Sequence, residues 1–367
     1  MIGDIEMNTP VTRRDFFLRN AASLPCLLTG AASLSFVETQ RSDKEAKSVP
    51  TLTGSVSCEQ LGTTLVHEHI LYGTTPREKR TDTVEFVVKL LNDAARVGIA
   101  TIVDLSPYRD IRLYQEIAPR SPVNIIVSTG FYLYGRTPKP LQDMNEQQME
   151  DRMVREISEG IEGAKIRAGI IKVSGQASPL TDWEKATFCA AARVQKATRT
   201  PIATHAIFEP REQFDLLVKS GVDPTRIFLS HTEAKFAWKG KNVKQMAEYL
   251  LAIAREGGSM LFNNFGFEFD TPWPDLVFLI RHLCENGCSN RVLISMDCNW
   301  EWKGGRIVFE AEEQHPETAK RTYSYMITDA VPALLKSGFS AKEIQVFLVD
   351  NPRRFFGGGL VQLAQSS

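Results

Sequence analysis

Short runs of apolar, β-branched residues recur along the chain, and segments with a helical pattern separate them. The eight runs lie at 63–70, 99–106, 123–130, 168–175, 200–206, 226–233, 259–264 and 291–298. Their length and β-branched content predict buried strands rather than pieces of helix. Between them, segments such as 83–98 and 242–258 place apolar residues at helical spacing and end in glycine. The chain is therefore predicted to alternate strands with helices.

Eight strands that alternate with helices predict a single α/β domain, a closed parallel (β/α)8 TIM barrel. We place this barrel at residues 51–360, with an extended, hairpin-like segment at 51–62 before the first strand. An open, doubly wound sheet is the alternative. That fold would need a glycine-rich phosphate-binding turn after the first strand, and the sequence VHEHIL has none.

The N-terminal segment has a different pattern. Arg13 and Arg14 precede Phe16, Phe17 and Leu18, and an apolar run rich in Ala, Ser and Gly follows. Residues 1–35 resemble a twin-arginine export signal, which predicts a bacterial protein exported to the periplasm, and 36–50 read as a linker. An amphipathic helix with a solvated basic end is the alternative. The apolar run is too short for a stable spanning helix, so we expect no membrane anchor.

Composition narrows the classes of function. With 43% hydrophobic and 24% charged residues in 367, the chain can bury a full core. The formal net charge of -1 offers no basic surface, so we expect no nucleic-acid partner. The oligomeric state stays open, with a homodimer among the options.

Six polar residues interrupt these buried runs, and side-chain alternation predicts their directions. His67 and His69 should project the same way, with Glu68 opposite, and Lys172 should share a face with Ile170 and Ser174. Catalytic groups of such barrels lie at the carboxyl ends of the strands. We expect all six there: His67, His69, Lys172, His205, His231 and Asp297.

Each of these residues alone has a structural explanation as a satisfied core histidine, a loop cap or an ion-paired lysine. Together, four imidazoles and a carboxylate predict a metal site with more ligands than one zinc ion normally takes from protein. Two divalent ions need an anion between them. A carbamate formed from CO₂ and a deprotonated Lys172, which is N6-carboxylysine, would supply it. Zinc, manganese, cobalt and iron all suit such ligands.

The ordered motifs HEH, IIKVSG, ATHA, LSHTE and SMDC resemble those of the phosphotriesterase family of the amidohydrolase superfamily, which includes the phosphotriesterase-like lactonases. The resemblance runs from about residue 50 to the C-terminal NPRRFFG. It implies that His67, His69 and Asp297 bind the more buried metal, and His205 and His231 the more exposed one. It further implies that carbamylated Lys172 and a hydroxide bridge the metals, and that Asp297 accepts the proton during attack.

The resemblance also implies a second catalytic residue and a substrate wall. Tyr132 matches a tyrosine that lactonase-like members direct at the hydroxide or the lactone oxygen, although rim packing is an equal alternative. In the loop 263–270, Asn264 and Phe265 replace a charged pair of the relatives, and no histidine is present to relay protons. We predict a substrate-binding apolar wall. Its residues are Tyr132, Phe265, Trp300 and Trp302.

The sequence thus predicts a metal-dependent hydrolase of lactones or related esters, with promiscuous phosphotriester cleavage. A dedicated organophosphate hydrolase is the alternative enzyme. A metal-holding binding protein without turnover is the alternative of another class, and the retained proton acceptor Asp297 argues against it.

Overall fold

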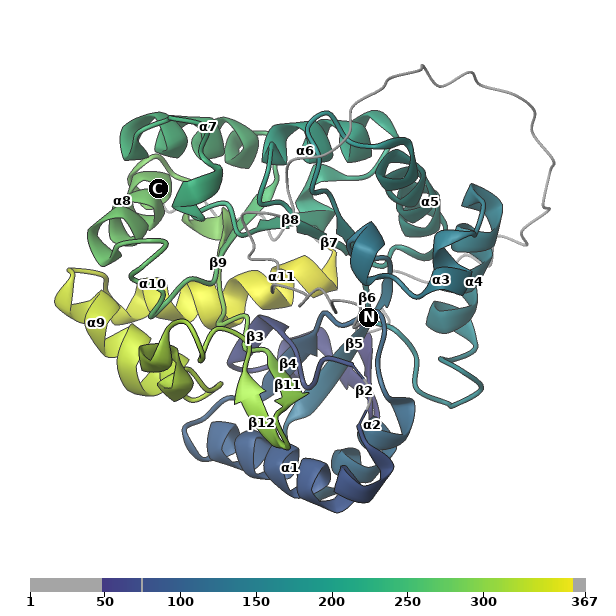
Figure 1. The fold of residues 1–367 in the computed structure, drawn as a ribbon. Coiled ribbons are helices and arrows are strands. Elements are labelled where there is room, and N and C mark those ends of the chain that lie inside the picture. Colours follow the sequence, from purple (N-terminus) through teal and green to yellow (C-terminus); the bar gives the residue numbers. More distant parts are fainter. Residues whose placement is uncertain (1–47, 74, 359–367) are drawn as a thin grey trace, which may run out of the picture.

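The computed structural model describes residues 48–73 and 75–358 (Figure 1). The predicted export signal and most of the predicted linker lie outside the described residues. The described chain begins with β1 (Ser48–Thr51), which pairs antiparallel with β2 (Gly54–Ser57). A hairpin is therefore present as predicted, but it begins at Ser48, within the segment predicted as a linker, and its second strand ends at Ser57.

Eight parallel strands form the centre of the molecule, and all eight coincide with predicted runs. Their hydrogen-bonded order follows the chain order from β3 to β10. They are β3 (Thr64–Glu68), β4 (Thr101–Asp104), β5 (Asn124–Gly130), β6 (Ile170–Ser174), β7 (Ile202–His205), β8 (Ile227–Ser230), β9 (Ser259–Phe262) and β10 (Val292–Ile294). Helices surround the strands (Figure 1), so the predicted (β/α)8 barrel is confirmed.

The barrel closes between β10 and β3 through residues that follow β10 rather than through a regular strand pair. The amide of Asp297 donates to the carbonyl of His67 at 2.9 Å, and the amide of His69 donates to the carbonyl of Cys298 at 2.8 Å. These bonds place the HEH motif directly beside Asp297.

The barrel interior is filled by one apolar residue from each strand. These residues are Val66, Val103, Ile126, Ile170, Ala203, Phe228, Leu261 and Leu293. The helix α11 (Asn351–Gly357) adds Phe355, whose ring centroid lies 5.1 Å from that of Phe228. Arg226, just before β8, donates to the carbonyl of Phe355, so α11 closes the amino-terminal end of the barrel. The carboxyl-terminal end of the barrel is therefore the end available for a catalytic site.

The outer layer consists of amphipathic helices whose apolar faces pack on the strands. The principal ones are α1 (Arg80–Arg96), α2 (Ile111–Ile117), α4 (Glu146–Ser158), α5 (Asp182–Thr198), α6 (Pro210–Lys219), α7 (Val243–Arg255), α8 (Trp273–Glu285), α9 (Val331–Lys336) and α10 (Ala341–Gln345). Capping boxes begin α5, at Thr181 and Glu184, and α7, at Asn242 and Gln245. None of the described helices is both long and apolar enough to span a bilayer.

The segment after Asp297, which carries Trp300 and Trp302, contains a short hairpin. It is built from β11 (Trp300–Lys303) and β12 (Arg306–Phe309). The indole Nε1 of Trp302 donates to Thr83 Oγ1 at 2.9 Å, which fastens the hairpin to α1 (Figure 1).

Candidate metal centre

The six polar residues predicted from the sequence meet at one end of the barrel. His205 is the last residue of β7, His231 directly follows β8, and Asp297 lies three residues beyond β10. In β3, the pairing with β4 shifts register between Leu65 and Glu68. Val66 faces the interior, so strict alternation would turn His67 outward, and this irregularity re-aims it.

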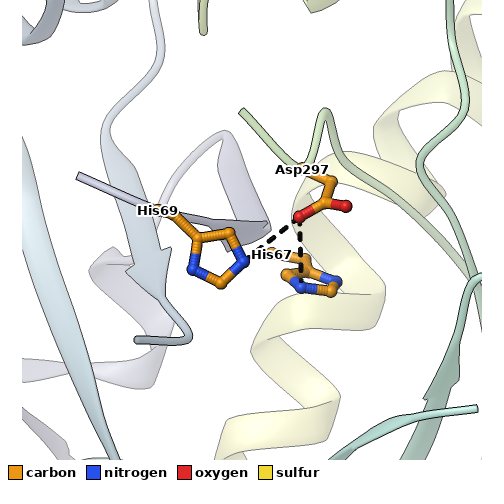
Figure 2. A group of neighbouring side chains, drawn as sticks. All are labelled: His67, His69 and Asp297. Atoms are coloured by element: carbon orange, nitrogen blue, oxygen red, sulfur yellow. Dashed lines mark ion pairs between the residues drawn. The ribbon is translucent and has the colours of Figure 1, made fainter. Parts of the chain in front are cut away.

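His67, His69 and Asp297 form a compact group in which one ligand atom of each lies within 4.8 Å of the others. Figure 2 shows both imidazoles pointing at one carboxylate oxygen: Nε2 of His67 lies 3.5 Å and Nε2 of His69 lies 3.2 Å from Asp297 Oδ1. The predicted common direction of the two histidines is thus confirmed. Two imidazole nitrogens and a carboxylate oxygen at one point are a donor set that suits a divalent metal ion.

A second pair of imidazoles adjoins this group. The ring centroids of His205 and His231 are 4.4 Å apart, and those of His231 and His67 are 5.1 Å apart. Nδ1 of His231 lies 3.7 Å from the second carboxylate oxygen of Asp297, Oδ2. Asp297 therefore faces His67 and His69 through Oδ1 and His231 through Oδ2.

Lys172 completes the group from β6. Its side chain is fully buried, and Nζ lies 3.4 Å from Nε2 of His67. Ile170 packs in the barrel interior while Ile171 and Val173 pack against the helices, as predicted. Burial lowers the pKa of Lys172 to about 7. A buried amine in this position is therefore a weak cation next to an array of metal-ligand atoms.

The protonation states also suit metal binding. Burial, together with the charges of Lys172 and the neighbouring imidazoles, holds the pKa of His67 well below its usual range. Burial opposes ionisation of Asp297, but the imidazoles of His67, His231 and His69 outweigh it and hold the pKa of Asp297 well below its usual range. A neutral imidazole and an ionised carboxylate are the forms that bind metals.

The backbone at two of these residues is strained. His231 has φ 64° and Asp297 has φ 49°, both in the left-handed region that favours glycine. Such conformations cost on the order of 1–3 kcal/mol and persist where the surrounding structure fixes them. Here both occur at predicted metal ligands, which ties the strain to the placement of those side chains.

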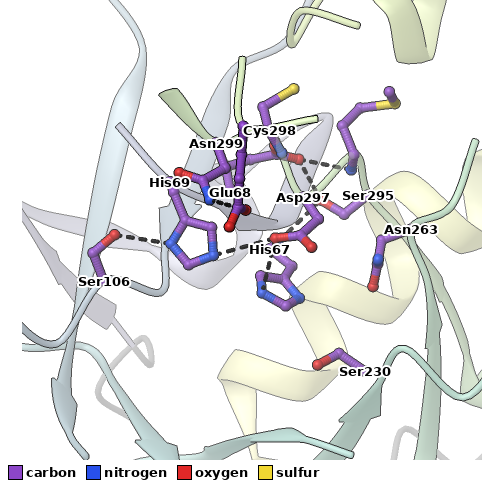
Figure 3. A network of polar contacts seen from close by, with 12 residues as sticks. His67, Glu68, His69, Ser106, Ser230, Asn263, Ser295, Asp297, Cys298 and Asn299 are labelled. Atoms are coloured by element: carbon purple, nitrogen blue, oxygen red, sulfur yellow. Dashed lines mark hydrogen bonds and ion pairs between the residues drawn. The ribbon is translucent and has the colours of Figure 1, made fainter. Parts of the chain in front are cut away.

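Glu68, which the sequence places opposite the histidines, fixes the segment that carries Asp297 (Figure 3). Its carboxylate accepts hydrogen bonds from Ser295 Oγ at 2.6 Å and from the amides of Met296 and Cys298 at 2.8 Å each. Burial raises the pKa of Glu68 to about 7. Three short bonds on both sides of Asp297 set the position of its backbone.

Other residues that sequence reasoning missed hold the imidazoles. Ser106 Oγ lies 2.8 Å from Nδ1 of His69 (Figure 3). Asn263 Nδ2 lies 3.1 Å from Nδ1 of His231. Partners of this kind orient metal-binding histidines. Ser106 and Asn263 each stand at the carboxyl end of a predicted strand, which is the one sequence signal that could have found them.

Arg321 is a missed residue without such a signal. It is fully buried, and it donates to the carbonyl of Phe265 at 2.6 Å and to that of Asn263 at 2.9 Å. It also donates to the carbonyl of Met296. One guanidinium thereby joins the segment after β9 to the segment after β10.

The predicted substrate residues occupy different environments. The ring of Tyr132 lies 5.3 Å from that of His205 and therefore beside the centre. Phe265 is fully buried in the core, and Trp300 packs against Phe86, Phe309 and Tyr323. Of the four residues, only Tyr132 has a ring that contacts a candidate metal ligand among the described residues. The substrate roles of Phe265, Trp300 and Trp302 stay predictions.

A cavity of about 1060 Å³ begins next to this centre. Tyr72 and Ser106 line it, and both contact His69, the ring of Tyr72 at a centroid distance of 4.9 Å. The cavity continues to residues of α4 such as Arg152. Its size suits an organic ligand.

We predict that Glu68→Gln weakens both the fold and the metal centre. The new amide would present a donor to an amide donor of Met296 or Cys298, and an unsatisfied buried group costs about 1–3 kcal/mol. Chemical denaturation should show this loss, and metal analysis should show a lower metal content because Asp297 is no longer held.

Glu184→Gln is the matched control for that variant. Glu184 is also buried and accepts amide hydrogen bonds, from Gln176, Ala177 and Thr181, but it caps α5. This variant should lose stability and keep its metal. If both variants lose stability equally and both keep their metal, Glu68 does not position Asp297.

Comparison with known proteins agrees with this geometry. The sequence profile of the Phosphotriesterase family matches residues 47–356. The "Phosphotriesterase homology protein" of Escherichia coli (strain K12) is 27% identical over an alignment of 311 residues, and the match covers 82% of this chain and 100% of that protein. The "Aryldialkylphosphatase" of Saccharolobus solfataricus is 26% identical over 318 residues, 82% of this chain and 97% of that protein.

Among solved structures, a mutant of the PTE-like lactonase from Deinococcus radiodurans superposes with a TM-score of 0.74 at 27% identity. The superposition covers 84% of this chain and 99% of that one. The family profile spans nearly all the described residues, including every motif of the candidate centre. The chain therefore belongs to the phosphotriesterase family.

Proposed function

We propose that this protein is a hydrolase with two divalent metal ions that cleaves lactones or related carboxylic esters, with aryl phosphotriesters as secondary substrates. The observation that carries the proposal is the convergence of four histidines and a carboxylate. His67 and His69 face Oδ1 of Asp297, His231 faces Oδ2, His205 lies against His231, and buried Lys172 lies beside His67. The similarity to a PTE-like lactonase over nearly that protein's whole length supports the substrate class.

The ligands divide naturally between two ions. His67, His69 and Asp297 would hold one, and His205 and His231 the other. Lys172, as N6-carboxylysine, would supply the anion between them. Zinc is our first choice because of the imidazole and carboxylate donors, and manganese, cobalt and iron have the same ligand preferences. When bound, such a pair lowers the pKa of water and polarises the oxygen of the substrate.

The protein side chains would then carry out the remaining tasks. Asp297 is ionised and presents Oδ2 toward His231, so this oxygen can accept the proton that hydrolysis releases. Tyr132 lies beside His205 and would donate a hydrogen bond from its hydroxyl to the substrate oxygen. The second candidate, a dedicated organophosphate hydrolase, is supported by the similarity to the aryldialkylphosphatase of Saccharolobus solfataricus.

A substrate panel on metal-loaded enzyme tests the proposal. We expect kcat/KM for γ- and δ-lactones to exceed that for aryl dialkyl phosphates by about 100-fold, which corresponds to ~2.7 kcal/mol of transition-state binding. A higher value for the phosphates would favour the organophosphate hydrolase. Protein that holds both metals and hydrolyses no member of the panel would favour a binding protein.

A further inference from the structure

The cavity beside the metal centre is lined by an excess of positive charge. Five basic side chains line it, against three glutamates. The basic residues are Arg109, Arg136, Arg152, Arg155 and Lys165. The whole chain has a formal net charge of -1, so this excess is local. A concave site with one sign of charge concentrates ligands of the opposite sign.

At the inner wall of the cavity, two arginines share one carboxylate. Glu156 Oε1 lies 2.9 Å from Nη2 of Arg152, and its Oε2 lies 3.8 Å from Nη2 of Arg109. The side chain of Arg109 is 2% exposed and that of Arg152 is 12% exposed. Two guanidiniums contact one carboxylate here, and Glu162 adds a more distant negative charge to Arg152. A bound anion would further balance the two buried cations, because burying a charge is costly unless it is paired.

One donor of this wall is also unsatisfied. Nε of Arg109 is buried and has no hydrogen-bond partner among the described residues. The guanidinium of Arg152 donates to the carbonyls of Gly130 at 2.8 Å and Pro107 at 3.2 Å, and that of Arg109 donates to the carbonyl of Ser128. These bonds fix the two cations at the wall, so they cannot swing into water. A preorganised pair of this kind suits a carboxylate or another oxyanion.

The outer part of the cavity adds two solvent-facing cations. Arg155 and Lys165 are exposed, and neither forms an ion pair with another side chain in the described ranges 48–73 and 75–358. Arg136 is different, because it pairs with Glu310 at 3.1 Å and lies over the ring of Tyr72. The positive charge therefore runs from the rim near the metal centre to α4.

We propose that this cavity binds an anionic group of the substrate, such as a terminal carboxylate, while the scissile ester lies at the metal centre. The position of the scissile ester in this inference rests on the proposed function. The binding of an anionic group rests on the residues of the cavity alone. Tyr72 and Ser106 belong to the cavity and contact His69, so the cavity and the metal centre share a wall. In this proposal the acidic tail would extend past Tyr72 into the cavity while the ester stays at the metal centre.

Matched substrates test the proposal. δ-Lactones with alkyl side chains of increasing length would carry either a terminal carboxylate or a terminal methyl group. We expect wild-type enzyme to prefer the carboxylate form once the chain is long enough. Arg152→Gln should raise KM for that form by about 10- to 100-fold, the value of a charge-assisted hydrogen bond, and leave the methyl form unchanged within about twofold.

Arg152 also holds two carbonyls, so a second variant keeps the test decisive if Arg152→Gln does not fold. The double variant Arg155→Gln/Lys165→Gln removes two exposed cations from the cavity and should raise KM for the carboxylate form by about 3- to 10-fold. Lys219→Gln/Lys244→Gln is the matched control, because it removes two exposed lysines that do not line the cavity. It should leave KM unchanged for both the carboxylate and the methyl substrate.

The outcomes separate the two proposals. Hydrolysis of the methyl form without any preference for the carboxylate form, or equal effects of all variants on both forms, overturns the anionic subsite and leaves the proposed function intact. If neither form is hydrolysed, the proposed function fails, and calorimetric titration of holoenzyme with glutarate decides the subsite. The anionic subsite is supported if glutarate binds and if the cavity variants, but not the control variant, weaken this binding. Absence of glutarate binding overturns the subsite.

Discussion

Lys172→Met should lose both metal ions and at least about 1000-fold in turnover, because two cations held close together require an anion between them. Methionine keeps the apolar stem of a side chain that is fully buried, so the change removes the amine and little else. Metal analysis and kcat on the purified variant are the measurements. Lys185→Met, on α5, which carries none of the predicted ligands and where the side chain is 40% exposed, should leave both unchanged.

Two further substitutions separate a carbamate from a structural lysine. Lys172→Arg should fare no better than methionine, since a guanidinium remains cationic and does not form a carbamate under these conditions. Lys172→Ala leaves room at the site, and added acetate or propionate should restore part of the metal content and turnover. A structural lysine gives the opposite pattern, with arginine tolerated and no rescue. Two bound metals and near-normal hydrolysis in Lys172→Arg would refute the carbamate.

Local pattern was sufficient to predict the barrel. Each strand is a short run of β-branched residues that is buried on both faces, and such runs stand out between amphipathic helices. The positions of the polar residues followed, because a parallel barrel brings the carboxyl ends of its strands together. Lys172 and His205 illustrate this, since both interrupt apolar runs and both lie in the candidate centre.

The residues that hold the ligands could not be found in the same way. Arg321 lies in an irregular segment, and its role depends on three carbonyls distant in sequence, those of Asn263, Phe265 and Met296. The irregularity that re-aims His67 arises from how β3 pairs with β4, and no pattern within β3 reveals it. The role of Arg321 and the direction of His67 both depend on contacts between segments that are distant in sequence.

The aromatic residues show a related limit. A tryptophan after the eighth strand can line a substrate pocket or join the core, and both need the same residue type. In the structure, the ring of Trp300 packs edge-on against Tyr323 at 5.0 Å, and it is 4% exposed. The cavity instead has tyrosines and arginines on its wall, which the alternation of polar and apolar residues does not reveal.

Asp297→Asn should lower kcat by about 10²- to 10⁴-fold at saturating metal, the usual contribution of a positioned proton acceptor. Asparagine matches aspartate in shape and keeps one oxygen for His67 and His69, but it cannot take up a proton and carries no charge. Metal affinity should also fall, since the carboxylate oxygens face His67, His69 and His231. Titrating metal into the variant separates the two effects, because excess metal restores occupancy and leaves the loss of proton transfer. Asp275 lies on α8, and Asp275→Asn, which breaks its surface pair with Lys235, is the control and should keep full activity. A kcat within about twofold of wild type, with both metals bound, would remove Asp297 from the chemistry and leave it as a ligand alone.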